Sequence, residues 1–365
     1  MIEFDFERLR ALGLTPALLT HTLAGRAADT TAGEEDSCQL MRVTEVHRES
    51  LRVHDGIVLR SARATPRLAR TLDDDETALA VGDWVLAAFD AHGTGTVHAL
   101  VPRLSHIARR DAVGRRHAVV SNVDTALLVM GLDDDFNPRR LERYLALVQG
   151  SGVAPVVVLT KRDVVTADKA VAQIALLHGR VPKGVEVLAV DATNAEAART
   201  LEPYITPGQT LVLMGSSGAG KSTLTNTLLG DATQDTGAVR EHDSRGKHTT
   251  TARSLHCLPS GACVIDTPGL RALRPDVDEA TLAASFADIE TLAATCRFRN
   301  CQHHDEPGCA VREGIGADRL RNFHKLLREA RRDTLSVLER QQQLAQWKAR
   351  GKATKARMKV KRGES

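Results

Sequence analysis

Residues 210–230 read TLVLMGSSGAGKSTLTNTLLG: an apolar run, a loop rich in glycine, and a segment of helical character. The loop matches the pattern GxxxxGKS, whose glycines let backbone N–H groups surround phosphates at the start of a helix. We expect Lys221 to reach the β- and γ-phosphates and the Ser222 hydroxyl to bind Mg²⁺. The phosphate-binding residues predicted from the pattern are Gly215, Ser216, Ser217, Gly218, Ala219, Gly220, Lys221, Ser222 and Thr223. The stretch therefore predicts a P-loop nucleoside triphosphatase.

Strand-like and helical segments alternate on both sides of this loop. The pair Asn137-Pro138 is typical of a helix start, with a capping side chain followed by proline at the first helical position. The apolar runs that we predict to be strands cover residues 126–130, 155–159, 185–190, 210–214 and 262–265. This alternation predicts a parallel sheet with helices on its faces.

Two further segments predict groups that would surround the γ-phosphate. Asp266 ends the run at 262–265, and we expect it to hold Mg²⁺ through water while the Gly269 N–H senses the γ-phosphate. Residues 231–251 form a long polar stretch, a length that in compact domains usually indicates function or disorder. A threonine of this stretch can bind Mg²⁺ and the γ-phosphate only when GTP is present. Thr250 is the preferred candidate, and Thr249 is its alternative.

A separate motif predicts that the base is guanine. Guanine offers N1–H and N2–H to a single carboxylate, and adenine does not. The run at 155–159 is followed by Thr160, Lys161, Arg162 and Asp163. We expect Asp163 to accept from the base, the Lys161 stem to pack along it, and the main-chain amide of Ala192 to contact it. A Lys-Arg-Asp triplet alone is more often a solvated turn, so this prediction depends on its position at a strand end.

The order of the motifs is unusual, because the guanine motif precedes the phosphate loop. Ordinary GTPases carry these elements in the opposite order. A sheet tolerates the change if the original termini are joined and the chain is opened elsewhere, since termini usually lie close together at the surface. The sequence therefore predicts a circularly permuted GTPase domain.

The N-terminal part has a different pattern. Residues 1–38 predict a short helix and a polar linker. Beyond them, short alternating runs cover residues 42–46, 51–53, 57–59, 84–86 and 96–100. They predict an antiparallel module of about five strands, such as the OB-fold barrel, or alternatively a β-domain without a ligand.

The C-terminal part contains a predicted metal site. Cys296, Cys301, His303 and Cys309 supply three thiolates and an imidazole, a closed tetrahedral set typical of structural Zn²⁺. His304 is the alternative to His303. Cys38, Cys257 and Cys263 lack such spacing, and we interpret them as unpaired or buried thiols. A helical run follows the cluster, with Leu320, Phe323 and Leu327 on one face.

Composition indicates a soluble protein of several domains. The 365 residues are 42% hydrophobic and 26% charged, with a net charge of +3. No apolar run reaches 18 residues and the N-terminus is unlike a signal peptide, so we expect a cytoplasmic protein with no membrane partner. Residues 347–365 carry eight basic residues and one acid, which indicates either a solvated tail or an arm for RNA.

Nine arginines of the barrel region and its exit are candidates for RNA contact. They are Arg60, Arg63, Arg67, Arg70, Arg103, Arg109, Arg110, Arg115 and Arg116. Aromatic residues make up only 3% of the chain, which disfavours stacking of bases along single strands. Phosphate and shape contacts to folded RNA therefore fit better, although such arginines often only decorate a surface.

The permuted GTPase motifs and the cysteine segment occur together with the sequences SNVD at 121–124 and NPRRL at 137–141. On these features, residues 40–330 resemble the RsgA family. These are circularly permuted GTPases that act as bacterial small-subunit ribosome-biogenesis factors. The resemblance implies an N-terminal OB-fold, a permuted GTPase domain and a helical zinc domain, and it selects His303 as the ligand. It also implies binding to the 30S subunit, whose contact stimulates GTP hydrolysis late in maturation.

The sequence departs from the family pattern in two places. Thr160 stands where asparagine is more usual, and we expect weaker tethering of the neighbouring loop. Leu270 stands where many GTPases have a glutamine that orients the attacking water. His248 is our candidate for that role, although a switch-loop histidine without chemistry is an equal alternative. No arginine finger is apparent, and the ribosome could complete the site.

We therefore predict a monomeric GTPase that binds rRNA and acts on the 30S subunit. Its predicted domains are an extension (1–38), an OB-fold (39–112), the GTPase domain (113–275), a zinc domain (276–340) and a basic tail (341–365). One alternative is a P-loop kinase or ATP-driven enzyme, which a preference for ATP would reveal. The other is an RNA-binding protein with a structural nucleotide, which would show no turnover with 30S subunits.

Overall fold

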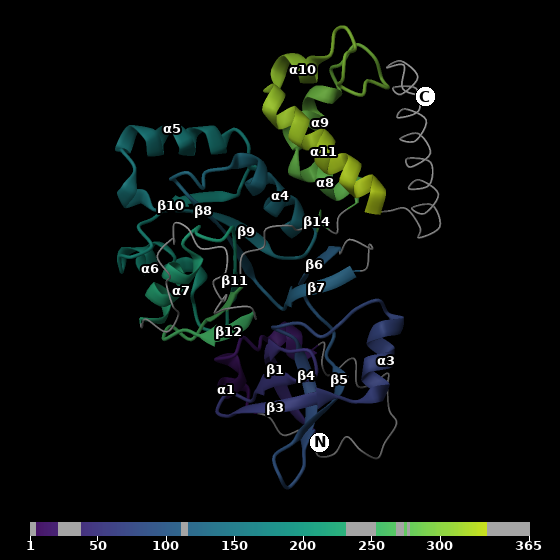
Figure 1. Ribbon diagram of the computed structural model, residues 1–365, viewed down its shortest axis with the longest axis vertical. Helices are drawn as coiled ribbons and strands as arrows, with labels where there is room; N and C mark the ends of the chain where they lie inside the picture. Colours follow the sequence, from purple (N-terminus) through teal and green to yellow (C-terminus); the bar gives the residue numbers. More distant parts are fainter. Residues whose placement is uncertain are drawn as a thin grey trace, which may run out of the picture.

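The computed structural model describes residues 5–20, 38–110, 116–230, 253–267, 274–275 and 278–333. Its elements form an N-terminal barrel, a central α/β sheet and a C-terminal group of helices (Figure 1). Among the described residues, no helix combines the length and the apolar character needed to cross a bilayer.

Five strands close the barrel: β1 (Gln39–Val46), β2 (Leu51–His54), β3 (Leu59–Ala64), β4 (Trp84–Phe89) and β5 (Gly95–Leu100). The order β1-β2-β3-β5-β4 is completed by pairing of β4 with β1. Met41, Val43 and Val85 are among the residues that fill the interior. The predicted OB-fold barrel is therefore confirmed.

The barrel differs from the prediction in three details. Ile57 and Val58 of the run at 57–59 are not in a strand, because Asp55 Oδ1 accepts from their N–H groups (2.8 Å each) and holds them in a turn. Strand β3 begins only at Leu59. The pairing of β3 with β5 is parallel, since the helix α3 (Pro66–Asp74) and β4 separate these strands in the chain. The sequence analysis missed α3, whose start is signalled by Thr65-Pro66.

The central sheet has the order β10-β9-β8-β11-β13-β12. Its parallel strands are β8 (Thr125–Gly131), β9 (Ala154–Thr160), β10 (Glu186–Ala189), β11 (Thr210–Met214) and β13 (Cys263–Asp266), which confirms the five predicted runs. Strand β12 (Ser254–Cys257), which was not predicted, is antiparallel to β13.

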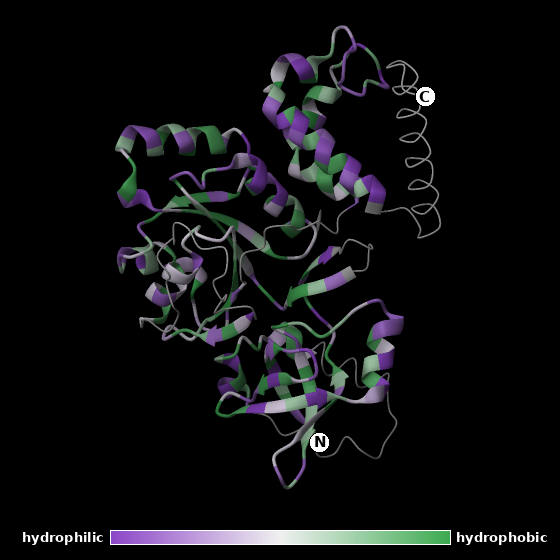
Figure 2. Ribbon diagram, viewed as in Figure 1, coloured by the Kyte–Doolittle hydropathy of each residue, from purple (hydrophilic) through white to green (hydrophobic). Residues whose placement is uncertain are grey.

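Helices cover both faces of this sheet. Alternate residues of β8 and β9 enter two separate cores, so both strands read as continuous apolar runs. The helices α4 (Pro138–Val148) and α5 (Ala167–His178) pack on one face, and α6 (Glu196–Thr200) and α7 (Lys221–Leu229) on the other. Figure 2 shows the green, hydrophobic strands of this sheet between helices of mixed colour.

The SNVD segment joins the barrel to the sheet. Ser121 Oγ donates to Asp83 Oδ1 (2.5 Å), and the Asn122 side chain donates to the Gly82 carbonyl (3.1 Å). Asp124 accepts from the Thr210 N–H at the start of β11 (2.7 Å). Burial raises the pKa of Asp124, although this hydrogen bond opposes the shift. The SNVD motif at 121–124 therefore has a structural role.

Buried cations strengthen the same junction. Arg42 is fully buried and donates to Thr210 Oγ1 (2.9 Å) and to the Asn122 carbonyl (2.8 Å). Arg103 pairs with the buried Asp83 (2.7 Å), so we withdraw it from the candidates for RNA contact, because its charge is already compensated.

A small sheet lies beside this junction. It contains β6 (His106–Arg110), β7 (Arg116–Ser121) and the short β14 (Arg274–Pro275), none of which was predicted. The predicted boundary between residues 112 and 113 falls between β6 and β7, whose strands pair with each other. Residues 111–115 lie outside the described part of the chain.

The C-terminal helices are α8 (Glu279–Ser285), α9 (Ala287–Ala293), α10 (Ala310–Gly314) and α11 (Ala317–Asp333). Phe286 and Phe323 meet in their core, with ring centroids 5.3 Å apart. Leu320 and Phe323 are buried and Leu327 packs against them, which confirms the predicted apolar face. The tail predicted at 341–365 lies outside the described residues.

Candidate nucleotide and metal sites

The phosphate loop connects β11 to α7, as the sequence predicts. Gly218 and Gly220 have φ angles of 81° and 88°, a region that favours glycine. A Cβ on Gly215 would lie 2.4 Å from the carbonyl oxygen of Val129, so a side chain there would displace backbone. The backbone path of this loop therefore requires its glycines.

Lys221 lies in the first turn of α7 and is 6% exposed. Its Nζ donates to the carbonyl oxygens of Gly215 (3.0 Å) and Ser216 (2.7 Å), both at the start of the loop. The Lys221 ammonium thus lies against the loop in which it is predicted to contact the phosphates. Ser222 and Thr223 follow it in the same turn, and both are partly buried.

The guanine motif contacts the phosphate loop directly. Thr160 is buried at the end of β9, and its Oγ1 donates to the carbonyl oxygen of Ala219 at 2.6 Å. We expected threonine at this position to weaken the tether relative to asparagine; the Thr160 hydroxyl does make a contact to the phosphate loop. Asp163 lies exposed in the short turn Arg162–Val164, three residues further along the chain.

The neighbouring strand brings Ala192 to the same place. Ala192 is buried, and its carbonyl oxygen accepts from Thr227 Oγ1 of α7 (2.6 Å). Because β9, β10 and β11 are parallel, Asp163, Ala192 and the phosphate loop lie at the carboxyl edge of one sheet. This edge is where open α/β sheets bind their ligands.

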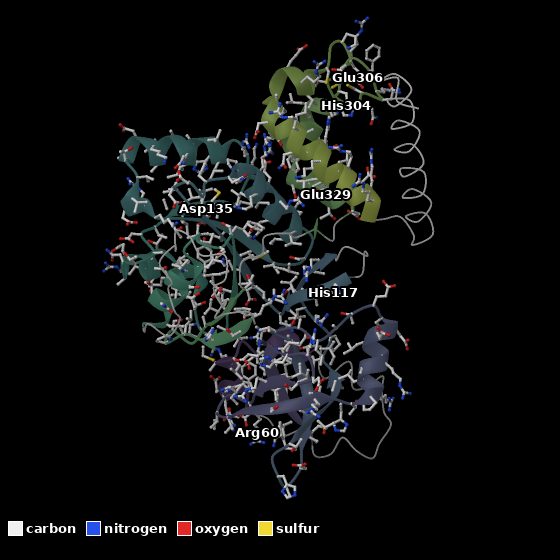
Figure 3. The ribbon with its side chains drawn as sticks, viewed as in Figure 1. Arg60, His117, Asp135, His304, Glu306 and Glu329 are labelled. Carbon is white, nitrogen blue, oxygen red and sulfur yellow. The ribbon has the colours of Figure 1, made fainter. Side chains whose placement is uncertain are left out.

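Two aspartates that the sequence analysis missed belong to this edge. Asp133 accepts from Lys161 Nζ (2.7 Å), and Asp135 accepts from Ser216 Oγ of the phosphate loop (2.6 Å). Partial burial favours the neutral acid, but the hydrogen bond from Lys161 lowers the pKa of Asp133. Figure 3 labels Asp135 within the central domain. The sequence does contain a signal for these two residues, because Asp133, Asp134 and Asp135 come in succession after a buried strand.

The predicted groups around the γ-phosphate are only partly described. Asp266 is 4% exposed at the end of β13, opposite Leu213 of β11 in the strand register. The next residue, Thr267, donates to the Leu213 carbonyl (2.6 Å), so this strand end is fixed beside the phosphate loop. His248, Thr249, Thr250 and Gly269 lie outside the described residues.

The metal motif converges in space. The donor atoms of Cys296, Cys301, His303 and Cys309 all lie within 4.8 Å of one another. The Sγ atoms of Cys296 and Cys309 are 3.9 Å apart, and His303 Nδ1 lies 3.7 and 3.5 Å from them. A tetrahedral zinc ion with Zn–S bonds of about 2.3 Å separates two sulfurs by about 3.8 Å. The donor set therefore fits a metal ion of that kind.

The competing histidine takes another position. The ring of His304 meets that of His324 on α11, with centroids 4.3 Å apart. Glu306 fixes the loop by accepting from the N–H groups of Gln302 and His304 (2.8 Å each), and these bonds lower its pKa to about 2. Figure 3 shows His304 and Glu306 at the same end of the C-terminal domain. His303, not His304, thus belongs to the cluster.

The chain is similar to proteins of one known family. A family model described as RsgA GTPase matches residues 100–275. A curated relative from Xanthomonas campestris pv. campestris (strain B100), named small ribosomal subunit biogenesis GTPase RsgA, is 49% identical over 282 residues, 76% of each chain. The chain belongs to the RsgA family. Another RsgA, from Xylella fastidiosa (strain M23), is 48% identical over 301 residues, which cover 79% of this chain and 87% of the relative.

Two solved structures share the fold of this RsgA family member. One is YjeQ from Thermotoga maritima, with a TM-score of 0.57 and 22% identity, covering 80% of this chain and 98% of that one. The other is YloQ, described as a circularly permuted GTPase, with a TM-score of 0.56, 20% identity and coverage of 84% and 100%. The RsgA family member described here is thus a circularly permuted GTPase with an N-terminal barrel.

Proposed function

We propose that this GTPase hydrolyses GTP during late maturation of the 30S ribosomal subunit, binds rRNA, and is stimulated by the subunit. Membership of the RsgA family supports this, since its curated relatives are named small ribosomal subunit biogenesis GTPases. We further propose that it acts as a monomer in the cytoplasm, where ribosomal subunits mature.

The contact between Thr160 and Ala219 is the observation that supports the nucleotide site most directly. It fixes the guanine motif to the phosphate loop, so one nucleotide can span both. Asp163 accepts from the two guanine donors and Ala192 contributes its amide, while Gly215 to Thr223 surround the phosphates. Lys221 releases the carbonyls of Gly215 and Ser216 to contact the β- and γ-phosphates.

Bound Mg²⁺ would neutralise charge on the β- and γ-phosphates. Ser222 and Asp266 are the residues that would hold it, and both lie at the edge of the sheet beside the loop. We assign ordering of the attacking water to His248, the closing contact to Thr250, and sensing of the γ-phosphate to the Gly269 N–H.

We propose a structural zinc ion for Cys296, Cys301, His303 and Cys309. Four protein donors leave no open position for a substrate, which is typical of structural zinc. Such an ion contributes free energy directly to the folding of a short segment. It would hold the loop between α9 and α10 against the core of the C-terminal helices.

A hydrolysis assay tests the whole proposal. GTP turnover is measured with and without purified 30S subunits for the unmodified protein, for Ser222→Ala, and for Ser61→Ala, an exposed serine of the barrel, as the control. Stimulation by subunits should survive Ser61→Ala and fall at least tenfold with Ser222→Ala. Equal rates under all conditions would exclude the assigned enzyme, and faster turnover of ATP than of GTP would indicate a different P-loop enzyme.

A further inference from the structure

A basic groove separates the GTPase domain from the C-terminal helices. It is a cavity of about 840 Å³, lined on one side by the start of α4. The other side is formed by α11 and by Gln302 and His304 of the loop between α9 and α10. Of its thirteen described lining residues, seven are arginine or lysine, two are histidine, and none is acidic. The groove therefore concentrates positive charge at a domain boundary.

Part of this charge is compensated from outside the groove. Arg143 of α4 pairs with Glu329 (2.5 Å) and Arg139 pairs with Asp318. Arg140 pairs with Asp135 (2.6 Å), and Arg331 of α11 pairs with Glu279 (3.0 Å). Figure 3 labels Glu329 on α11, on the side of the helix domain facing α4. The pairs of Arg139 and Arg143 join α4 to α11.

Three cations on the wall formed by α11 are not compensated in this way. Lys325 and Arg328 are exposed, and neither forms an ion pair with any described residue. Arg321 is exposed as well, and its nearest carboxylate, Asp318, is 3.9 Å away. The groove thus presents three weakly paired cations along one face of a helix, with spacings of three and four residues.

The chemistry of the lining indicates the ligand. Leu327 is the one apolar member of the described lining, so an acidic peptide would find no pocket for an apolar anchor. Phenylalanine, tyrosine and tryptophan are absent from the same set of residues, which disfavours stacking with unpaired bases. Guanidinium and ammonium groups spread over two domains instead match a row of phosphates.

We propose that this groove binds the backbone phosphates of folded RNA, with Arg321, Lys325 and Arg328 of α11 contacting successive phosphates. This inference rests on the proposed ribosomal function and adds a second RNA surface, remote from the barrel arginines. Because the two walls belong to different domains, RNA bound there contacts the GTPase and zinc domains together.

The test uses the full-length protein with its metal and a non-hydrolysable GTP analogue. Binding to purified 30S subunits and to a folded small-subunit rRNA transcript is measured for Lys325→Glu/Arg328→Glu. The control is Lys169→Glu/Lys183→Glu, which changes the net charge equally at exposed positions outside the groove. We expect at least tenfold weaker binding of both probes for the groove variant and less than a twofold change for the control. The plot of log affinity against log salt should also become shallower by about one unit for each phosphate that the variant no longer neutralises.

Three outcomes would overturn the proposal. Equal binding by the groove variant and the control would show that the groove has no part in RNA contact. Loss of subunit binding with an unchanged affinity for the transcript would assign the groove to a ribosomal protein. The third outcome concerns the neutral variants. If Lys325→Gln/Arg328→Gln weakens RNA binding no more than Lys169→Gln/Lys183→Gln does, the weaker binding of the glutamate variant is due to misfolding.

The basal GTPase rate separates this inference from the proposed function. Lys325 and Arg328 lie outside the nucleotide site, so the groove variant should hydrolyse GTP without subunits at the unmodified rate. Absence of turnover in every variant would refute the proposed enzyme, whereas binding of the transcript would still decide the role of the groove.

Discussion

The hydroxyl of Thr160 donates a 2.6 Å hydrogen bond to the carbonyl oxygen of Ala219. These residues belong to motifs far apart in the chain, one following β9 and the other following β11. A Cβ on the adjacent Gly220 would lie only 3.3 Å from the same hydroxyl, so the two loops are closely packed. The segment predicted to read the base is therefore joined directly to the phosphate loop.

Removal of this hydroxyl should weaken nucleotide binding. A net hydrogen bond contributes about 1 kcal/mol, so Thr160→Ala should raise the Kd for GDP about fivefold. Titration with a fluorescent GDP analogue measures the change. Thr160→Ser keeps the hydroxyl and is the matched control. An affinity unchanged in Thr160→Ala would mean that the hydrogen bond does not organise the site.

Asp163→Asn should change base preference. Guanine loses an acceptor for one of its two donors, and hydrogen bonds to charged groups contribute about 1.5–3 kcal/mol, so GTP affinity should fall at least about tenfold. Xanthine carries a carbonyl at C2, which can accept from the new amide, so affinity for xanthosine triphosphate should rise. Competition binding with both nucleotides measures this, with Asp168→Asn on α5 as the control. Equal losses for both nucleotides would refute base reading by Asp163.

The metal cluster predicts different zinc contents when a ligand is replaced and when the neighbouring His304 is replaced. Cys301→Ser removes a donor, so the purified protein should contain much less than one zinc per chain and unfold at a lower temperature. His304→Ala should retain one zinc, because His304 packs against His324 instead. Elemental analysis and thermal unfolding measure both. Zinc lost from His304→Ala but kept by Cys301→Ser would reverse the ligand assignment.

A buried ion pair joins α4 to the C-terminal helices. Glu142 is 3% exposed and accepts from Arg319 (2.6 Å), which is 5% exposed and also pairs with Asp288 (2.8 Å). Glu142→Leu leaves a buried cation without this partner and should lower the free energy of unfolding by about 3–5 kcal/mol. Denaturant unfolding measures it.

The second substitution tests whether the pair itself is the cause. Arg319→Met in the same chain should restore at least half of the loss, since the buried cation is removed and Asp288, which then loses its partner, is 35% exposed and can be solvated. Glu279→Ala breaks the exposed pair with Arg331 and should cost less than about 1 kcal/mol. A double variant no more stable than Glu142→Leu would attribute the loss to packing.

The pair between Asp318 and Arg139 predicts a dependence on pH. Hydrogen bonds from Arg139 and Arg180 lower the pKa of Asp318 to about 2 in the folded protein, below the value of about 4 in an unfolded chain. A depressed pKa gives stability that is complete above pH 4 and is lost as the pH falls toward 2.

This dependence is measured as the difference in unfolding free energy between the unmodified protein and Asp318→Asn. Because the side chain is 39% exposed, solvent screening should keep the difference below about 1 kcal/mol at pH 6. The difference should shrink between pH 4 and pH 2.5, and the subtraction cancels acid effects on the metal ligands. A difference that stays constant over this range would exclude the ion pair as its cause.

The sequence by itself determined the chemistry that depends on local spacing. The loop at 215–222 sits between a strand and a helix, and the C-x4-C-x-H-x5-C spacing brings its donors together because a short backbone segment limits their separation. The parallel strands followed from apolar runs that are buried on both faces. The start of strand β3 was misplaced and helix α3 was missed, because a turn built by Asp55 and a cap at Thr65 are not recorded in simple periodicity.

Only the tertiary structure decided which distant side chains meet. The bonds from Thr160 to Ala219 and from Ser216 to Asp135 join separate strand ends, and the basic groove joins helices from two domains. No periodicity records such pairs, because sheet order and domain packing determine them after each local element has formed. The sequence therefore specified the reactive groups, and the packing of the chain determined how they are connected.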